Sequence, residues 1–187
     1  MEIDRQYLNE TLAALVSINS VNPKLVPGGA GEREIVAYIA QSLAGIGLEV
    51  AVHEPEPGRP SVVGRLPGRA GSPSLMLNAH IDTVGVTGMD EPFSAHVRDG
   101  RLYGRGAYDM KGALAACMAA AKALVDAGVE LAGDLLVAAV ADEEYASLGT
   151  SDLLGRYRVD AAIVTEPTEL DLCLAHKGFI WLEVETI

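Results

Sequence analysis

The sequence has 187 residues, with 14 Lys or Arg against 26 Asp or Glu, which gives a net charge of −12. Because 49% of the residues are hydrophobic and only 21% are charged, the composition excludes a disordered chain. The length fits one domain with a real core, or one domain and the beginning of another. The acidic balance disfavours nucleic acid as a partner, and cations are the better expectation.

The sequence shows no sign of an export signal or a membrane span. Residues 1–5 are acidic, and no positively charged segment precedes an apolar run there. The longest apolar stretches fall far short of the ~20 residues that a spanning helix needs. Cys117 and Cys173 lack the Cys-x-x-Cys spacing of thiolate sites, so we expect two buried, inert thiols. A cytoplasmic protein without a membrane partner is therefore predicted.

The predicted elements alternate between helix and strand along the chain. Apolar residues with helical spacing predict helices over residues 8–16, after Asp4 as a suitable N-cap, and over 35–43. A strand is predicted near residues 48–53, and short apolar runs predict buried strands at 61–66, 75–79, 135–141 and 161–164. One apolar stripe over residues 111–127 predicts a long helix that Gly128 ends. This alternation predicts a layered α/β domain.

The end of the sequence changes character. Ile180, Leu182 and Val184 alternate with polar or amphipathic residues, which predicts a strand with one face in solvent. The sequence stops at Ile187 inside this pattern, without a polar tail, so we expect that part of the protein is missing.

Three of the predicted strands end in side chains that are suited to bind a metal ion. These are His80 with Asp82, the run Asp142-Glu143-Glu144, and Glu166. In open α/β sheets, ligands bind outside the carboxyl ends of the strands, so the three motifs are expected to converge. Asp109, just before the long helix, is a fourth candidate. Carboxylates gathered in this way would repel one another unless a cation neutralised them.

Each motif also has a simpler explanation. His80 alone is equally typical of a core histidine, but residues i and i+2 of an extended segment share a face. The Asp82 carboxylate can therefore accept a hydrogen bond from the second ring nitrogen of a metal-bound His80. The run at 142–144 can be a solvated acidic turn, although its place after seven apolar residues favours a pocket rim. Glu166 before Pro167 can be an ordinary strand exit.

The Gly104-Arg105-Gly106 loop before a predicted helix raises the question of a dinucleotide site. The third glycine of that fingerprint is absent, and Asp109 would lie where phosphate charge belongs. We therefore reject a nucleotide-binding role. The loop is either a tight strand-to-helix turn or a device that holds Asp109 in an unusual backbone geometry against a metal.

Taken together, four motifs in this order resemble the dinuclear-zinc aminoacylase and exopeptidase family, which includes acetylornithine deacetylase, succinyl-diaminopimelate desuccinylase and glutamate carboxypeptidases. The motifs are His80-Ile81-Asp82-Thr83-Val84, Gly104-Arg105-Gly106-Ala107-Tyr108-Asp109-Met110-Lys111-Gly112, Asp142-Glu143-Glu144 and Thr165-Glu166-Pro167-Thr168. The resemblance implies an α/β fold with a central mixed, largely parallel sheet flanked by helices. It also implies an incomplete, zinc-binding catalytic domain at residues 1–176 and the start of a lid or dimerisation domain at 177–187.

The resemblance further implies a role for each motif residue. His80 and Glu166 would bind one zinc ion, Asp109 would bridge two, and Glu144 would bind the second. Asp82 would orient His80, and Glu143 would be the general acid and base. Members of the family also tend to hold the peptide bond after the bridging aspartate in the cis form, which makes Asp109–Met110 a candidate. Cobalt or manganese can substitute for zinc in such a donor set.

The implied activity is hydrolysis of an amide bond in small N-acyl amino acids, with water activated by the metal ions and the proton carried by Glu143. Two alternatives stay open, namely a dipeptidase or carboxypeptidase of the same family and a non-catalytic metal-binding fragment. The last histidine ligand of the family would lie beyond Ile187. We therefore expect this chain alone to be inactive or impaired, and the full-length protein to be a homodimer.

Overall fold

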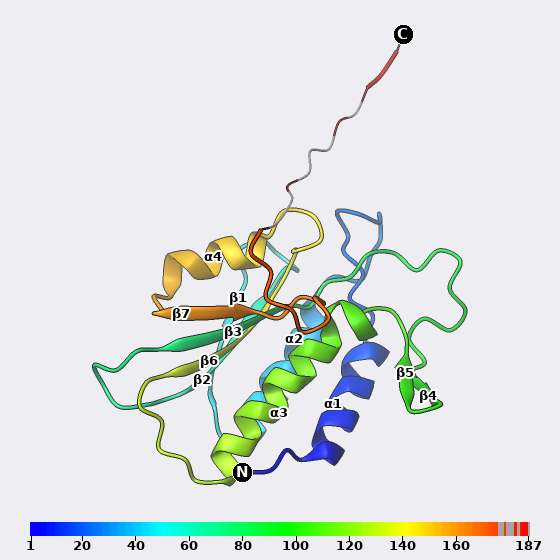
Figure 1. Ribbon diagram of the computed structural model, residues 1–187. Coiled ribbons are helices and arrows are strands. Elements are labelled where there is room, and N and C mark those ends of the chain that lie inside the picture. The colour runs from blue at the N-terminus through cyan, green and yellow to red at the C-terminus, as the bar shows by residue number, and fades with distance from the viewer. Residues whose placement is uncertain (176–177, 179–181, 183, 187) are drawn as a thin grey trace.

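The computed structural model describes residues 1–175, 178, 182 and 184–186, and its centre is a five-stranded mixed sheet (Figure 1). The strands are, in sheet order, β1 (Glu49–His53), β2 (Ser61–Leu66), β6 (Leu135–Val140), β3 (Leu75–His80) and β7 (Ala161–Val164). β2 runs antiparallel to β1 and β6, whereas β3 runs parallel to β6 and β7. The predicted mixed α/β sheet is confirmed, but the prediction that it is largely parallel is wrong, since only two of its four strand pairings, β6 with β3 and β3 with β7, are parallel. The short segment between β1 and β2 turns the chain back, which gives an antiparallel pair.

Helices cover both faces of this sheet (Figure 1). Three of them, α1 (Arg5–Ser17), α2 (Arg33–Gly45) and α3 (Gly112–Asp126), correspond to predicted helices. α1 begins at the predicted N-cap, where a carboxylate oxygen of Asp4 accepts a hydrogen bond from the Tyr7 N–H at 3.0 Å. The fourth, α4 (Leu148–Arg156), was not predicted. None of the described helices is long and apolar enough to cross a bilayer.

Strand alternation divides the core into two clusters. In β6, Leu135, Val137 and Ala139 pack in the cluster that also contains the apolar faces of α1, α2 and α3. Leu136, Ala138 and Val140 of the same strand pack in a second cluster with Leu153 of α4. Because successive side chains of a strand point to opposite faces, a strand that is apolar throughout is buried on both sides. All six residues of β6 are buried, as predicted for this run.

A small hairpin lies apart from the main sheet (Figure 1). It consists of β4 (His96–Arg98) and β5 (Arg101–Tyr103), which pair antiparallel around Asp99 and Gly100. Both turn residues have positive φ, 52° and 73°, and such a turn favours an Asp-Gly pair. This hairpin was not predicted, although its Asp-Gly pair is a recognised sequence signal.

The end of the described chain departs in part from the sequence predictions. The strand at 161–164 forms as β7, but the prediction that it is buried is wrong, since all four residues are exposed. β7 lies at the sheet edge, and the helices pack mainly on the other four strands. Cys117 is buried as predicted, but Cys173 is exposed because it lies in an irregular segment after β7. Half of the strand predicted at residues 180–185, namely residues 180, 181 and 183, lies outside the described residues.

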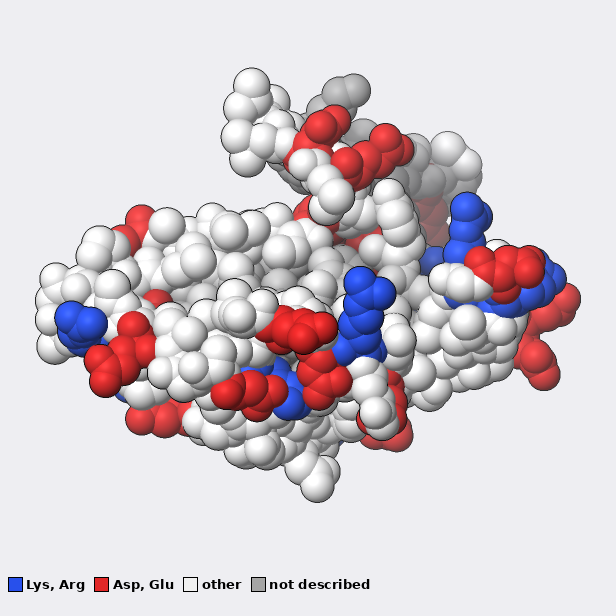
Figure 2. Space-filling view, turned by 60° about the horizontal axis from the view of Figure 1, so that its bottom comes forward, with Lys and Arg blue, Asp and Glu red and all other residues white. Residues whose placement is uncertain are grey.

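Many cations on the acidic surface lie beside carboxylates. On the face shown in Figure 2, Lys and Arg side chains lie next to Asp and Glu side chains rather than in a continuous basic patch. The same pattern occurs along the helices, for example between Arg156 and Asp152 one turn apart on α4, with Nε and Oδ2 at 2.7 Å. Exposed pairs of this kind contribute little to stability, about 0–1 kcal/mol each.

Candidate metal centre

The predicted metal-binding motifs lie at one edge of the sheet. β3, β6 and β7 are parallel, so their carboxyl ends meet there. His80 is the last residue of β3, while Glu166 follows β7 and the acidic run at 142–144 follows β6. Asp109 comes from η1 (Ala107–Lys111), a short helical turn with a kink that leads into α3. The topology therefore brings four distant segments to one place, as the switch-point rule for α/β sheets predicts.

His80 is held in a single orientation. Its side chain is 1% exposed, and its Nδ1 lies 2.9 Å from the main-chain carbonyl oxygen of Asp82. A carbonyl oxygen only accepts, so Nδ1 donates and carries the proton, which leaves Nε2 to face Asp109. This differs from the prediction, in which the Asp82 carboxylate was the acceptor; its Oδ1 is 3.7 Å from Nδ1.

Two ligand-type side chains, those of Asp109 and Glu166, converge on Nε2 of this histidine. The ligand atoms of His80, Asp109 and Glu166 all lie within 4.8 Å of one another. Nε2 is 3.0 Å from Asp109 Oδ1 and 3.9 Å from Glu166 Oε2. A zinc ion holds nitrogen and oxygen ligands at about 2.0–2.2 Å, which places two ligands of one tetrahedral ion about 3.4 Å apart. The three side chains therefore fit a single divalent ion in both chemistry and spacing.

The charges in this cluster shift its pKa values in the way a cation site requires. Burial works to lower the pKa of His80, but the hydrogen bond to Asp109 and the nearby carboxylates raise it to about 9. The hydrogen bond from His80 holds the pKa of Asp109 below its usual range, although burial opposes this. The cluster thus favours a positive charge at its centre, whether a proton or a metal ion supplies it.

The acidic turn after β6 lies beside this cluster. Glu143 Oε2 is 3.9 Å from His80 Nε2, and the Glu143 side chain is 38% exposed, so it remains accessible to water. Glu144 is not one of the three clustered ligands, but burial, together with the carboxylates of Asp109, Asp82 and Glu143, raises its pKa to about 7.

The glycine loop positions Asp109. Gly106 has a φ of 79°, and a Cβ there would lie 2.9 Å from Cγ2 of Thr83. A side chain would be strained at this left-handed, closely packed position, so glycine allows the tight turn that leads to Asp109. This turn agrees with both alternatives given for the loop. The Asp109–Met110 peptide bond is cis, as the family resemblance predicted.

Sequence reasoning missed several polar residues behind this edge. Lys111 is fully buried, donates from Nζ to the Ile18 carbonyl at 2.9 Å, and has a pKa lowered by burial to about 7. Asn22, Glu32 and Arg59 are also buried. Arg59 donates to Glu32, and both Arg59 and Asn22 donate to Asp142. Nothing in the local sequence marks them, because each has its partner in a distant segment; Asn22 before Pro23 was interpreted only as a break between helices.

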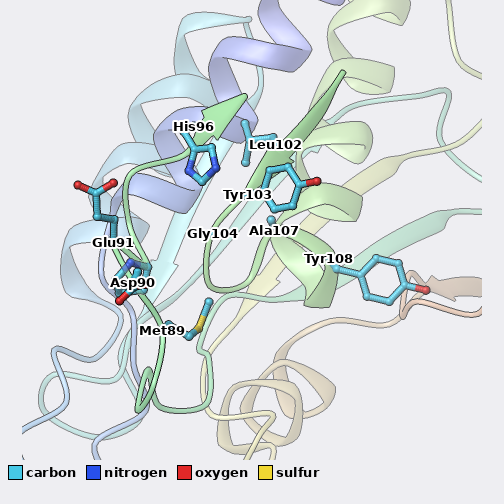
Figure 3. A pocket seen from close by; sticks show the side chains of 10 residues that line it. Met89, Asp90, Glu91, His96, Leu102, Tyr103, Gly104, Ala107 and Tyr108 are labelled. Atoms are coloured by element: carbon cyan, nitrogen blue, oxygen red, sulfur yellow. The ribbon is translucent and has the colours of Figure 1, made fainter. Parts of the chain in front are cut away.

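A cavity of about 380 Å³ lies close to η1 but outside the metal cluster. Figure 3 shows its lining, in which Asp90, Glu91, His96 and Tyr103 lie around the hollow while the Tyr108 side chain points away from them. His80, Asp109 and Glu166 do not line it. The convergence of ligand side chains, rather than this cavity, therefore locates the candidate site.

Comparison with known sequences agrees with this location. The profile of peptidase family M20/M25/M40 matches residues 76–177, the segment that contains all of the motif residues named above. The chain is 34% identical to an N-formyl-4-amino-5-aminomethyl-2-methylpyrimidine deformylase of Bacillus subtilis, over 86% of this chain and 39% of the relative. It is 33% identical to a succinyl-diaminopimelate desuccinylase of Rickettsia typhi, over 84% and 43% of the two chains. The chain thus spans about two fifths of the length of such relatives.

Solved structures share the fold. An M20 family metallo-carboxypeptidase from Sulfolobus solfataricus superposes with a TM-score of 0.73 at 24% identity, over 84% of this chain and 37% of that one. Human carnosine dipeptidase 1 gives a TM-score of 0.71 at 22% identity, over 87% and 38%. These likenesses show the fold, and the profile match over more than half of the sequence shows that the chain belongs to peptidase family M20/M25/M40.

Proposed function

We propose that this chain supplies the metal-binding and acid–base part of an amide hydrolase that acts on small N-acyl amino acids. The observation that carries the proposal is the convergence of His80, Asp109 and Glu166 within 4.8 Å, with the Glu143 carboxylate 3.9 Å from the same histidine nitrogen. A pure binding site has no use for an accessible carboxylate that is not among the ligands, so Glu143 favours a catalytic role.

Each side chain then has one task. His80 and Glu166 would hold one ion, Asp109 would be a ligand of both ions, and Glu144 would hold the second. Bound divalent ions acidify water and polarise the amide carbonyl. Glu143 takes the proton from the attacking water and passes it to the departing amine. Asp82 keeps His80 oriented through its carbonyl oxygen.

The substrate class rests on the relatives. The desuccinylase and the acetylornithine deacetylase of Vibrio atlanticus, which is 30% identical over 91% of this chain, favour an N-acyl amino acid. The Bacillus subtilis relative favours a second candidate, an N-formyl group on an aminopyrimidine. The structural likeness to a carnosine dipeptidase keeps a dipeptide as a third. All three contain an amide bond with a small polar amine as leaving group.

Metal content tests the binding step. The parent, Asp109→Asn and Glu143→Gln are dialysed and analysed for zinc per chain, with Asp126→Asn as a control because Asp126 lies on α3 in an exposed position. We expect one or two zinc ions in the parent, the control and Glu143→Gln, and a loss in Asp109→Asn. A folded parent that retains no zinc or cobalt overturns the proposal.

Hydrolysis tests the catalytic step. N-formyl, N-acetyl and N-succinyl amino acids, the formylated aminopyrimidine and dipeptides are offered to this chain and to a version extended by the downstream coding sequence, each with added Zn²⁺ or Co²⁺. Glu143→Gln should lower the rate about 10²–10⁴-fold at unchanged metal content. Equal rates in Glu143→Gln and the parent would remove Glu143 from the mechanism.

Three broader assignments belong to the same proposal. Zinc is the native metal, in line with the imidazole and carboxylate donors of the cluster. Residues 1–176 are the catalytic domain and 177–187 begin a lid or dimerisation domain. The longer protein is a cytoplasmic homodimer, which its size in gel filtration and cell fractionation would test.

A further inference from the structure

A continuous chain of buried polar side chains runs behind the metal cluster. It begins at Glu32, next to α2, and passes through Arg59, Asp142 and Asn22 to Asp82. All five residues are buried, with at most 5% of the side chain or residue exposed. Arg59 donates from Nε and Nη2 to the two carboxylate oxygens of Glu32, both at 2.7 Å. Its Nη2 also donates to Asp142 Oδ1 at 2.8 Å. Arg59 therefore ties the start of α2 to the turn after β6.

Asn22 carries the chain onward to the metal site. Its Nδ2 donates to the same Asp142 oxygen at 3.0 Å and to Asp82 Oδ2 at 2.7 Å. One amide thus bridges two buried carboxylates that would otherwise repel each other. Arg59 is the cation that the path contains, so its position decides where Asp142, and through it Asn22, can lie.

The last link of the chain reaches the acidic turn directly. The Asp82 carboxylate accepts hydrogen bonds from the main-chain N–H of Glu143 at 2.9 Å and of Glu144 at 3.2 Å. The turn itself is unusual, since Asp142 has a φ of 66° in the left-handed region. A carboxylate that holds two consecutive N–H groups fixes the backbone from which the Glu143 and Glu144 side chains project.

Such a network is poorly explained by stability alone. Burying charges costs desolvation energy, and well-packed apolar residues of similar volume often replace a buried ion pair at no loss of stability. Here burial, followed by the charges of Asp82 and Asp142, raises the pKa of Glu32 in spite of its pairing with Arg59. The path runs from α2 to the turn beside the ligands, which indicates that the network holds this turn in place.

We propose that Arg59 is a positioning residue, which through Asp142, Asn22 and Asp82 holds the Glu143–Glu144 turn in register with His80, Asp109 and Glu166. The inference rests on the proposed function in one respect, because that function gives Glu143 and Glu144 their roles. Arg59 itself belongs to none of the metal-binding motifs and is not one of the clustered ligands.

Amide hydrogen exchange on the metal-free chain tests the positioning without any metal. Arg59→Met removes the cation, and Arg59→Lys keeps the charge but lacks the planar fork that reaches both Glu32 and Asp142. The control is Arg65→Met, since Arg65 also pairs with two carboxylates, Glu49 and Asp134, but is 41% exposed. We expect the amides of Glu143 and Glu144 to exchange about tenfold faster in Arg59→Lys, more in Arg59→Met, and at the parental rate in the control.

Co²⁺ titration adds a spectroscopic measurement. The Arg59 variants should bind Co²⁺ about 10–100-fold more weakly than the parent and with an altered visible spectrum, while Arg65→Met keeps both. If Arg59→Met does not fold, Arg59→Lys decides the outcome. Parental exchange at Glu143 and Glu144 in a folded Arg59→Lys overturns the positioning role. A parent that binds no Co²⁺ overturns the proposed function instead, and the exchange data still decide the role of Arg59.

Discussion

The two ends of β2 carry the same kind of ion cluster in opposite surroundings. Near its start, Arg59 pairs with Glu32 and Asp142, and these three side chains are 5%, 0% and 4% exposed. Near its end, Arg65 pairs with Glu49 and Asp134, which are 64% and 29% exposed while Arg65 is 41% exposed. The distances are almost equal, 2.7–2.8 Å at both ends.

The difference lies in what replaces a lost partner. Water can solvate Glu49 or Asp134 if Arg65 is removed, whereas Glu32 and Asp142 would remain buried without a cation. Because β2 and β6 are antiparallel, the start of β2 adjoins the carboxyl end of β6, where the acidic turn begins. The buried cluster therefore lies at the edge that carries the candidate metal site, and the exposed one at the opposite edge.

The largest effect is expected from Arg59→Met. Removing one partner of a buried ion pair leaves uncompensated charge, so the free energy of unfolding should fall by about 3–5 kcal/mol. Urea unfolding followed by circular dichroism at pH 7 measures this. A parental urea midpoint for Arg59→Met would show that the buried cluster contributes no more than the exposed one.

Asn22→Ala should have the next largest effect. The substitution takes one shared donor from two buried carboxylates, Asp82 and Asp142, which should cost about 1–3 kcal/mol of unfolding free energy. Asn19→Ala is the control, because Asn19 is exposed and its side chain accepts a single hydrogen bond, from the Val21 N–H. Urea unfolding compares the two variants. Equal losses of unfolding free energy would mean that the Asn22 amide contributes no more than the exposed Asn19 side chain.

Arg65→Met should change the free energy of unfolding by only about 0–1 kcal/mol. The ion pairs of Arg65 are partly exposed, and fixing the long side chains costs conformational entropy that offsets the attraction. Salt sharpens the comparison. Raising NaCl to 1 M shortens the screening length to about 3 Å, so any contribution of Arg65 should vanish while that of Arg59 persists. A loss of the Arg59 contribution in high salt would contradict its assignment as a buried cluster.

The smallest effects are expected from pH, and they have opposite signs at the two ends. Burial raises the pKa of Glu32, so the folded protein binds the extra proton and this group adds stability as pH falls toward 4.5. The hydrogen bond from Arg65 lowers the pKa of Asp134, so the stability this group adds is present above 3.8 and lost as pH falls through the lowered value. The free energy of unfolding, measured from pH 7 to pH 3, should lose the Glu32 contribution to its pH dependence in Glu32→Gln and the Asp134 contribution in Asp134→Asn.

The strands and long helices were predictable because their signal is local. The bounds predicted for the strands at 61–66 and 161–164 are those of β2 and β7, and the periodicity behind α1, α2 and α3 was sufficient to place them. α4 escaped prediction because it is short and contains Gly149 and Gly155, which weaken a helical pattern. The exposure of β7 depends on what packs over it, which its own four residues do not encode.

For the candidate site, the convergence of the ligand-type residues was predictable, but their supporting contacts were not. His80 and Glu166 converge as predicted because the parallel strands β3 and β7 end at one edge, and Asp109 reaches the same place from η1. Which Asp82 oxygen holds His80 was not predictable, since both the carbonyl and the carboxylate are within reach of a residue two positions away. Arg59 and Asn22 left no trace in the sequence because their contacts cross 83 and 120 positions to Asp142.

The origin of the three clustered ligands has a consequence for folding. An ion held by His80, Asp109 and Glu166 would act as a cross-link that closes a loop of 29 positions and a longer one behind it. No local stretch of the unfolded chain offers this set of donors, so the ion would be released on unfolding. The melting temperature should therefore rise with the logarithm of the free metal concentration, and a chelator should return it to that of the bare chain. A metal ion bound in this way would stabilise the fold as well as take part in the reaction.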